Sequence, residues 1–189
     1  MQRATVAEKE IIVDILTCSF ADNQSINYTI KQDERKEQRI RKLMEYSFDV
    51  CSMFGDIFIS DDRMGCALVV MPDKKKTTFT SIWLDIKLLF AAVGIANAKR
   101  AITREAAINK IHPDEPLYYL WFIGVHPSGQ GNGVGSSLLN NVVQEGRNKQ
   151  RTVCLETSTL KNIPWYEKHG FKIYQELDFG YTLYCMKLT

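Results

Sequence analysis

The sequence lacks several patterns that would assign a function at once. Its five cysteines, at 18, 51, 66, 154 and 185, show no C-x-x-C spacing, so we expect buried, reduced thiols in a cytoplasmic chain without a zinc site. The three histidines, at 112, 126 and 169, have no companions in sequence that would predict a metal site or a nucleophile triad. No uninterrupted apolar run reaches the roughly 18 residues of a membrane span, and the charged N-terminus is unlike a signal peptide.

A strong excess of one charge is also absent. The chain has 24 basic and 22 acidic residues and a net charge of +2, so we expect neither a nucleic acid nor a membrane as partner. The run Lys74-Lys75-Lys76 follows Pro72-Asp73 and is interpreted as a solvated turn. With 189 residues, 45% of them hydrophobic, we expect one domain over residues 1–189, as a monomer or homodimer.

The most informative stretch is an apolar run from Tyr118 to Val125, followed by glycines at 131, 133 and 135. Its aromatic and branched residues predict a strand buried on both faces, and the glycines lead into a helix. Strand, glycine-rich loop and helix together favour an anionic ligand, because backbone N–H groups and the helix N-terminus face it. The spacing matches neither a P-loop, which needs Gly-Lys-Ser/Thr, nor the G-x-G-x-x-G dinucleotide fingerprint.

Apolar periodicity predicts a mixed α/β sheet with helices on both faces. We expect helices over residues 6–20, 40–54, 79–93, 98–111 and 133–148, a helical turn from residue 162, and strands over residues 57–59, 66–71, 118–125, 152–156, 171–175 and 181–188. The polar segment 21–25 is predicted to end the first helix, and Gly94 to separate two helices. The stripe that contains Trp83, Ile86 and Phe90 is typical of core packing, but we hypothesise that at least one of the three walls the acceptor pocket instead.

Two motifs in the C-terminal half resemble the GNAT superfamily of N-acetyltransferases. Gln130, Gly133 and Gly135 match its Q-x-x-G-x-G loop, and the segment from Tyr166 to Phe171 matches its Y-x-x-x-G-F pattern. The resemblance is carried by residues 117–189. It implies a mixed, mostly antiparallel twisted sheet with helices on both faces, acetyl-CoA as co-substrate, and a helical insert at about 77–111 where related chains have a short link.

The resemblance also implies a coenzyme site. In this sequence it would comprise Ile123, Gly124, Val125, Gln130, Gly131, Asn132, Gly133, Val134, Gly135, Ser136, Asn162 and Tyr166. The loop would hold the pyrophosphate and Ile123–Val125 the pantetheine arm, although Gly124 has the alternative of making room for a neighbouring side chain. Asn162 is a weaker assignment, since the position at which many relatives carry asparagine is Thr159 here.

The expected chemistry is attack of a primary amine on the acetyl thioester. The resemblance places Tyr166 as the general acid for the departing thiolate, with buried filler as the alternative role. Glu156, at the end of its strand, is the one acidic residue we name as a general base, and a solvated or salt-bridged glutamate is the alternative. We predict acetylation of a small amine. Acetylation of a protein lysine or N-terminus, or acyl-CoA binding without turnover, are the alternatives.

Overall fold

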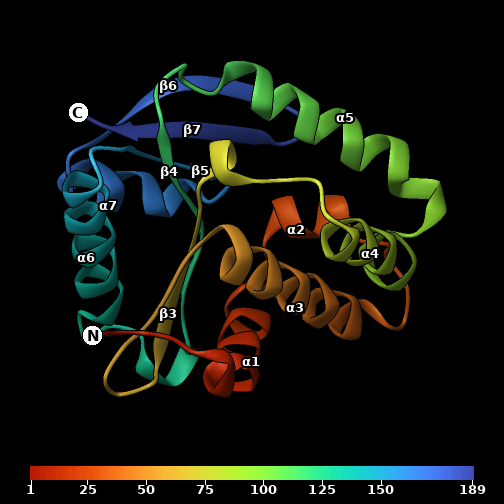
Figure 1. The fold of residues 1–189 in the computed structure, drawn as a ribbon, viewed down its shortest axis with the longest axis horizontal. Helices are drawn as coiled ribbons and strands as arrows, with labels where there is room; N and C mark the ends of the chain where they lie inside the picture. Colours follow the sequence, from red (N-terminus) through yellow and green to blue (C-terminus); the bar gives the residue numbers. More distant parts are fainter.

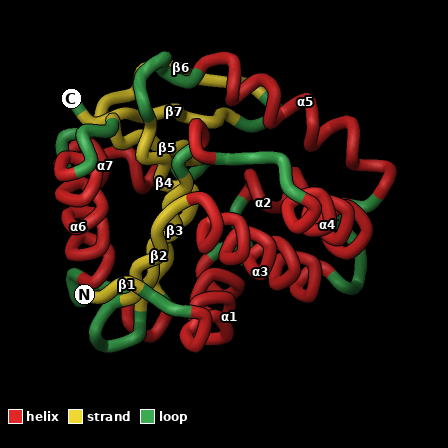
Figure 2. Tube along the Cα trace, viewed as in Figure 1, coloured by secondary structure: helices red, strands yellow, loops and turns green.

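A seven-stranded sheet in the order β1-β2-β3-β4-β5-β7-β6 forms the centre of the computed structural model, which describes residues 1–189 (Figure 1, Figure 2). The strands are β1 Gln2–Arg3, β2 Gly55–Ile59, β3 Gly65–Val70, β4 Leu117–Val125, β5 Thr152–Thr157, β6 Phe171–Asp178 and β7 Thr182–Leu188. Every neighbouring pair is antiparallel except β4 with β5. The predicted mixed, mostly antiparallel sheet is therefore confirmed.

Helices cover both faces of this sheet. They are α1 Lys9–Ser19, α2 Gln24–Thr29, α3 Lys36–Phe54, α4 Phe79–Leu88, α5 Ile95–Ile111, α6 Val134–Asn148 and α7 Ile163–Lys168. Shorter helical turns are η1 Val6–Glu8, η2 Pro72–Lys74, η3 Leu89–Val93, η4 Pro127–Gly129 and η5 Leu160–Asn162. All the predicted helices are present, but α2 was not expected. The polar segment that was predicted to end the first helix also begins α2. Asn23 is the N-cap of α2, because its side chain accepts a hydrogen bond from the Ile26 amide at 3.1 Å.

Two apolar cores lie on opposite sides of the sheet, as the period of two in a strand requires. On β3, Cys66, Leu68 and Val70 face α1 and α3, whereas Ala67 and Val69 face α6. We call these sides the α1 face and the α6 face. On each face, the apolar side of the covering helices packs against the sheet. The strands β2 and β3 are therefore buried on both faces.

The central strand β4 contains a β-bulge at Trp121. Leu68 of β3 pairs with Phe122 and Val69 with Leu120, which leaves Trp121 without a partner. The extra residue changes the alternation: Leu120 belongs to the α6-face core, whereas Phe122 belongs to the α1-face core. Contrary to the sequence-based expectation, β4 is not buried on both faces, because alternate residues from Tyr119 onward are only half-buried.

The segment between β3 and β4 forms the expected helical insert. Thr78 and Ser81 cap the start of α4 reciprocally, and Gly94, with φ of +77°, turns the chain into α5. The two helical arms bend by 118° at that glycine, and no single helix in the chain is long and apolar enough to cross a bilayer. In Figure 1, α4 lies beyond α3, and α5 runs back from it toward β6 and β7 of the sheet.

Two expectations about burial were wrong. The stripe containing Trp83 and Phe90 is not core, since these side chains are 57% and 63% exposed. Periodicity shows that a helix has an apolar face but not what that face meets. Cys18 is exposed as well, whereas the other four cysteines are buried and all five are free thiols.

Candidate functional site

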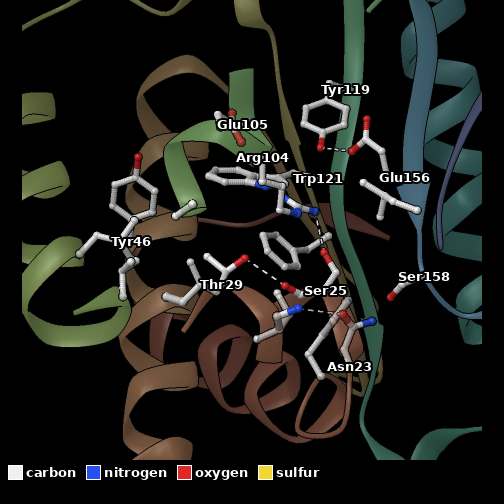
Figure 3. Close-up of a pocket in the computed structure, with 18 of the residues that line it drawn as sticks. Asn23, Ser25, Thr29, Tyr46, Arg104, Glu105, Tyr119, Trp121, Glu156 and Ser158 are labelled. Carbon is white, nitrogen blue, oxygen red and sulfur yellow. Dashed lines mark hydrogen bonds between the residues drawn. The ribbon is translucent and has the colours of Figure 1, made fainter. Parts of the chain in front are cut away.

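A cavity of about 620 Å³ passes through the sheet between β4 and β5. Phe122 of the α1-face core and Tyr166 of the α6-face core both line it. Twenty of its 32 lining residues are hydrophobic, so it suits a ligand with a substantial apolar part. Figure 3 shows its polar members: Tyr119 and Glu156 point toward one another, and Tyr46 of α3 lies on another wall.

The cavity exists because the two parallel strands diverge. They pair only from Leu117 to Tyr119 with Thr152 to Cys154, although β4 continues to Val125 and β5 to Thr157. Beyond Tyr119, the edge of β4 that faces β5 therefore has no strand partner. Such an edge presents unpaired N–H and C=O groups, to which an extended ligand can bind as an added strand.

Glu156 lies on the α1-face side of this gap with two partners. The Tyr119 hydroxyl donates a short hydrogen bond to one carboxylate oxygen, and His112 Nε2 lies 3.3 Å from the other. The histidine and glutamate side chains are 10% and 5% exposed, so the glutamate is neither solvated nor on the surface. Burial, and then the nearby carboxylate, raise the pKa of Tyr119 well above its ordinary value, which keeps this hydroxyl a donor.

Tyr166 lies on the α6-face side of the same gap. It is 5% exposed, packs edge-on against Phe171, and lines the cavity. Burial raises its pKa far above the ordinary value, so the phenol stays protonated at neutral pH. Its hydroxyl has no hydrogen-bond partner within the chain, and it is therefore available to a ligand.

The glycine loop lies beside this end of the cavity. Gly131 and Gly133 have φ of +85° and +77°, and a side chain added at either would meet no atom within 4 Å. No side chain caps α6, so the amides of its first turn point outward without a partner from the cap residue. Trp165 Nε1 donates to Ser136 Oγ at 3.0 Å, which joins the start of α6 to the helix that carries Tyr166. The loop is thus exposed and presents backbone N–H groups of the kind that bind anions.

Not every residue of the predicted coenzyme site faces the cavity. Ile123 lines it, but a side chain on Gly124 would come within 3.0–3.2 Å of Leu16 and Ser19 in α1, so this glycine makes room for α1. The Val125 carbonyl accepts hydrogen bonds from Ser19 Oγ at 2.9 Å and Gln130 Nε2 at 3.2 Å. Gln130 therefore joins the loop to the strand end, while Asn132 and Val134 remain within the exposed loop and the first helical turn.

Three polar residues after β5 line the cavity. Asn162 and Thr159, the two alternatives for a pantetheine contact, both do so. Ser158, between them and the strand, was not predicted from the sequence. Its buried hydroxyl has no hydrogen-bond partner in the chain, and a buried polar group left unpaired is costly unless a ligand or water pairs with it.

The insert provides much of the apolar wall on the α1 face. Ile82, Ile86 and Leu89 line the cavity from α4 and η3, and Ala98 and Ile102 from α5. Among its polar residues, Asp85 accepts a hydrogen bond from the Tyr46 hydroxyl at 2.7 Å, and Arg104 Nη2 donates to Ser25 Oγ at 2.6 Å. Trp83 and Phe90 do not line the cavity.

Sequence reasoning missed His112, Tyr119 and Ser158. His112 has a neighbour that its sequence context does not show, because a glutamate 44 residues away lies beside it. No local signal marks that pair. The sequence offered a weak indication for Tyr119, since this residue lies on the predicted central strand, five residues before Gly124.

Comparison with known proteins agrees with this geometry. Residues 88–173 match the family model described as an acetyltransferase (GNAT) domain. The Corynebacterium glutamicum structure described as histone acetyltransferase HPA2 and related acetyltransferase has a TM-score of 0.75 at 23% identity, over 98% of this chain and 93% of that one. Arylalkylamine N-acetyltransferase 2 from Aedes aegypti has a TM-score of 0.66 at 14% identity, over 98% and 96%. Drosophila melanogaster polyamine N-acetyltransferase has 0.59 at 12%, over 99% and 97%.

At these identities the solved structures show that the fold is similar. The resemblance predicted from the sequence is confirmed: the chain has the fold of GNAT acetyltransferases, and residues 88–173 match the model of their domain.

Proposed function

We propose that this chain, a GNAT acetyltransferase by family and fold, transfers an acetyl group from acetyl-CoA to the primary amine of a small molecule that has an apolar body. One observation carries the proposal. A single cavity connects a buried tyrosine on the α6 face with a buried glutamate on the α1 face, through the gap between β4 and β5. A reaction with a proton donor and a proton acceptor on opposite sides of one carbonyl fits that arrangement.

The α6 face fits the coenzyme. The uncapped first turn of α6, from Val134 to Ser136, and the open loop at Gly131 and Gly133 offer backbone N–H groups to a pyrophosphate. The unpaired edge of β4 at Ile123 would pair with the amides of the pantetheine arm. The chain further offers the unpaired Ser158 hydroxyl and the Asn162 amide to the same arm.

Glu156 would accept the proton that the acceptor must lose, since a primary amine is largely protonated at neutral pH. Hydrogen bonds from Tyr119 and His112 would fix the direction of the Glu156 carboxylate. His112 is also close enough to Glu156 to share with it the proton taken from the amine. The neutral amine would then attack the acetyl carbon. The C–N bond forms, and the oxyanion is stabilised by backbone N–H groups of the free β4 edge.

Tyr166 would donate its proton to the sulfur as the C–S bond breaks, giving free coenzyme A. Its raised pKa suits this step, because the phenol holds its proton until a stronger base, the thiolate, forms beside it. The second proton of the attacking nitrogen returns to the tyrosine through solvent. Overall, a protonated amine and acetyl-CoA give one amide, one thiol and one released proton.

The acceptor follows from the α1-face wall. Apolar residues of α4, η3 and α5 dominate it, so an acceptor with an apolar or aromatic body would bury surface there. Asp85, Glu105 and Glu156 provide three carboxylates against the cations of Lys75 and Arg104. Because the carboxylates outnumber the cations, the cavity favours a positively charged end group.

A thiol-release assay with acetyl-CoA tests the proposal, using arylalkylamines, polyamines, amino acids, aminoglycosides and peptides as acceptors. We expect turnover with monoamines that carry an apolar group, and mass spectrometry should find one acetyl group on the product nitrogen. Turnover with lysine peptides or protein N-termini alone would replace the small acceptor with a protein. Binding of acetyl-CoA without thiol release from any amine would contradict the proposed catalysis.

A further inference from the structure

An exposed apolar stripe runs along α4 and η3, and of its four residues only Ile86 also lines the cavity. Phe79, Trp83, Ile86 and Phe90, spaced by four, three and four residues, are 95%, 57%, 41% and 63% exposed. That spacing puts all four on one side of the helix. Monomeric proteins rarely expose four large aromatic or branched residues in one continuous line, so the stripe requires an explanation.

The fold itself does not need this stripe. α4 is attached by its other side, where Ser81 is buried and Leu84 and Leu88 pack against the α1-face core. Ala92 and Val93, at the end of η3, are buried as well. In Figures 1 and 2, α4 lies at the edge of the molecule, with the sheet on the far side of α3. The stripe is therefore exposed on the outside of the protein.

The charges around the stripe are strongly one-sided. Residues 74–100 contain six lysines and arginines against one acid, Asp85, whereas the rest of the chain has 18 basic and 21 acidic residues. The six are Lys74, Lys75, Lys76, Lys87, Lys99 and Arg100, and none forms a salt bridge. Asp85 faces the cavity, where it is bonded to Tyr46. Lys87 Nζ lies 5.5 Å from the centre of the Trp83 ring, directly beside the stripe.

We propose that α4 and η3 dock the protein on an anionic membrane surface. Phe79, Trp83 and Phe90 would enter the headgroup region, while Ile86 stays at the edge of the cavity. The lysines before α4 and Lys87 would lie against anionic headgroups. Apolar residues with tryptophan on one side and unpaired cations beside them are what a helix lying in the interface requires. The docking is peripheral, since no single helix is long and apolar enough to cross a bilayer and the insert bends by 118° at Gly94.

The same charges disfavour other occupants. In a symmetric dimer through the stripe, the basic segment of one copy would face that of the other, and like charges would repel. A nucleic acid would match the cations, but it offers no apolar surface to four large side chains. An anionic lipid surface matches both features at once.

Vesicle flotation tests this inference without any assay of catalysis. We expect the purified chain to float with vesicles of phosphatidylcholine and phosphatidylserine, and to remain behind with phosphatidylcholine alone. Trp83→Ser, Phe90→Ser and the pair Lys74→Glu with Lys76→Glu should each lower the bound fraction at least about 10-fold, because apolar area and charge both contribute to interfacial binding. Trp83→Phe should keep binding but remove most of the blue shift in tryptophan emission.

Matched controls lie on other surfaces. Val6 is 76% exposed, and Lys168 and Lys172 are exposed without salt bridges, so Val6→Ser and the pair Lys168→Glu with Lys172→Glu should bind like the parent chain. Absence of binding to phosphatidylserine vesicles at low salt would overturn the proposal. So would equal loss in control and stripe variants, or a shift in mass by light scattering that shows the stripe joining two copies.

Discussion

His112 Nε2 lies 3.3 Å from one oxygen of Glu156, and the Tyr119 hydroxyl donates to the other. The three residues come from the end of α5, from β5 and from β4, and they meet where the two parallel strands have begun to separate. A carboxylate held from both sides cannot rotate freely, so its direction toward the cavity is fixed. That geometry makes Glu156 the first residue to change.

Replacing Glu156 by glutamine should lower kcat by ~10²-fold, because an amide cannot take the amine proton. The protein should stay folded, since the glutamine oxygen can still accept from Tyr119. Steady-state rates and a melting curve measure the two effects. Tyr119→Phe is the matched control: it removes one hydrogen bond, keeps the carboxylate, and should cost less in kcat. An unchanged rate in Glu156→Gln would assign the base elsewhere.

Tyr166→Phe should keep the packing against Phe171 and remove only the proton donor. We expect kcat to fall by ~10²-fold with little change in coenzyme affinity, because the hydroxyl acts on the leaving sulfur. Comparing kcat with the Kd for acetyl-CoA separates the two effects. A variant as fast as the parent enzyme would mean that solvent protonates the thiolate.

The glycine loop can be tested with a pair of variants that differ in charge alone. Gly131 has φ of +85° and open space around it, and aspartate and asparagine are the side chains that best tolerate positive φ. Gly131→Asp should weaken acetyl-CoA binding at least tenfold, or about 1.4 kcal/mol, whereas Gly131→Asn should change it much less. Calorimetry at two salt concentrations decides the matter. Equal effects would mean that the loop does not meet the phosphates.

The insert offers a comparison between a cavity residue and its exposed neighbours. Ile86 lines the cavity and is 41% exposed, so Ile86→Ala should raise the acceptor KM about five- to tenfold with a stability loss under about 1 kcal/mol. Phe90→Ala and Trp83→Ala should change neither quantity with a water-soluble acceptor. Separate KM values for acceptor and acetyl-CoA, with melting temperatures, test this. Equal acceptor KM in all three variants would remove α4 from the site.

A pH-dependent prediction concerns how the insert is held. Arg39 donates to Asp33 Oδ2 at 2.6 Å and to the Ala91 carbonyl of η3 at 3.1 Å. The hydrogen bond from Arg39 is the main reason why the pKa of Asp33 lies well below its ordinary 3.8. The folded state therefore binds this proton less readily than the unfolded chain, so the pair stabilises fully above pH 3.8 and its contribution is lost as pH falls through the lower, folded value.

Asp33→Asn should accordingly lower the melting temperature at neutral pH. The difference from the parent chain should shrink as the pH falls below 3.8, because protonation removes the same charge from the parent. A melting series in pH measures it. A constant difference would mean that the aspartate acts through packing and not through its charge.

Most of the fold followed from local patterns in the sequence. Gly94 and the apolar repeats placed both arms of the insert, and the hairpin of β2 and β3 was expected from its polar turn. The bulge at Trp121 was not predictable, because it depends on the register that β3 imposes from some fifty residues away. The exposure of Trp83 was missed for a related reason, since periodicity defines a face and tertiary packing decides what covers it.

The site divides in the same way. Tyr166 and the glycines could be proposed from the sequence because their spacing within a short segment is itself the signal. His112 and Ser158 depend on where other elements end, so their partnership or lack of a partner exists only in three dimensions. Glu156 was named from its position on β5, but its burial between two side chains could not be derived from sequence.

The place of the insert in the chain has a consequence for how such a protein diversifies. One continuous segment between β3 and β4 supplies α4, η3 and α5, while Glu156, Tyr166 and the glycine loop all come from later in the chain. Mutation within that segment, or its exchange for another that keeps His112 at its end, would change the wall that an acceptor meets and leave Glu156, Tyr166 and the glycine loop in place. If the proposed function holds, acceptor preference and transfer chemistry would be encoded largely by separate stretches, so that one could drift under selection while the other is held constant.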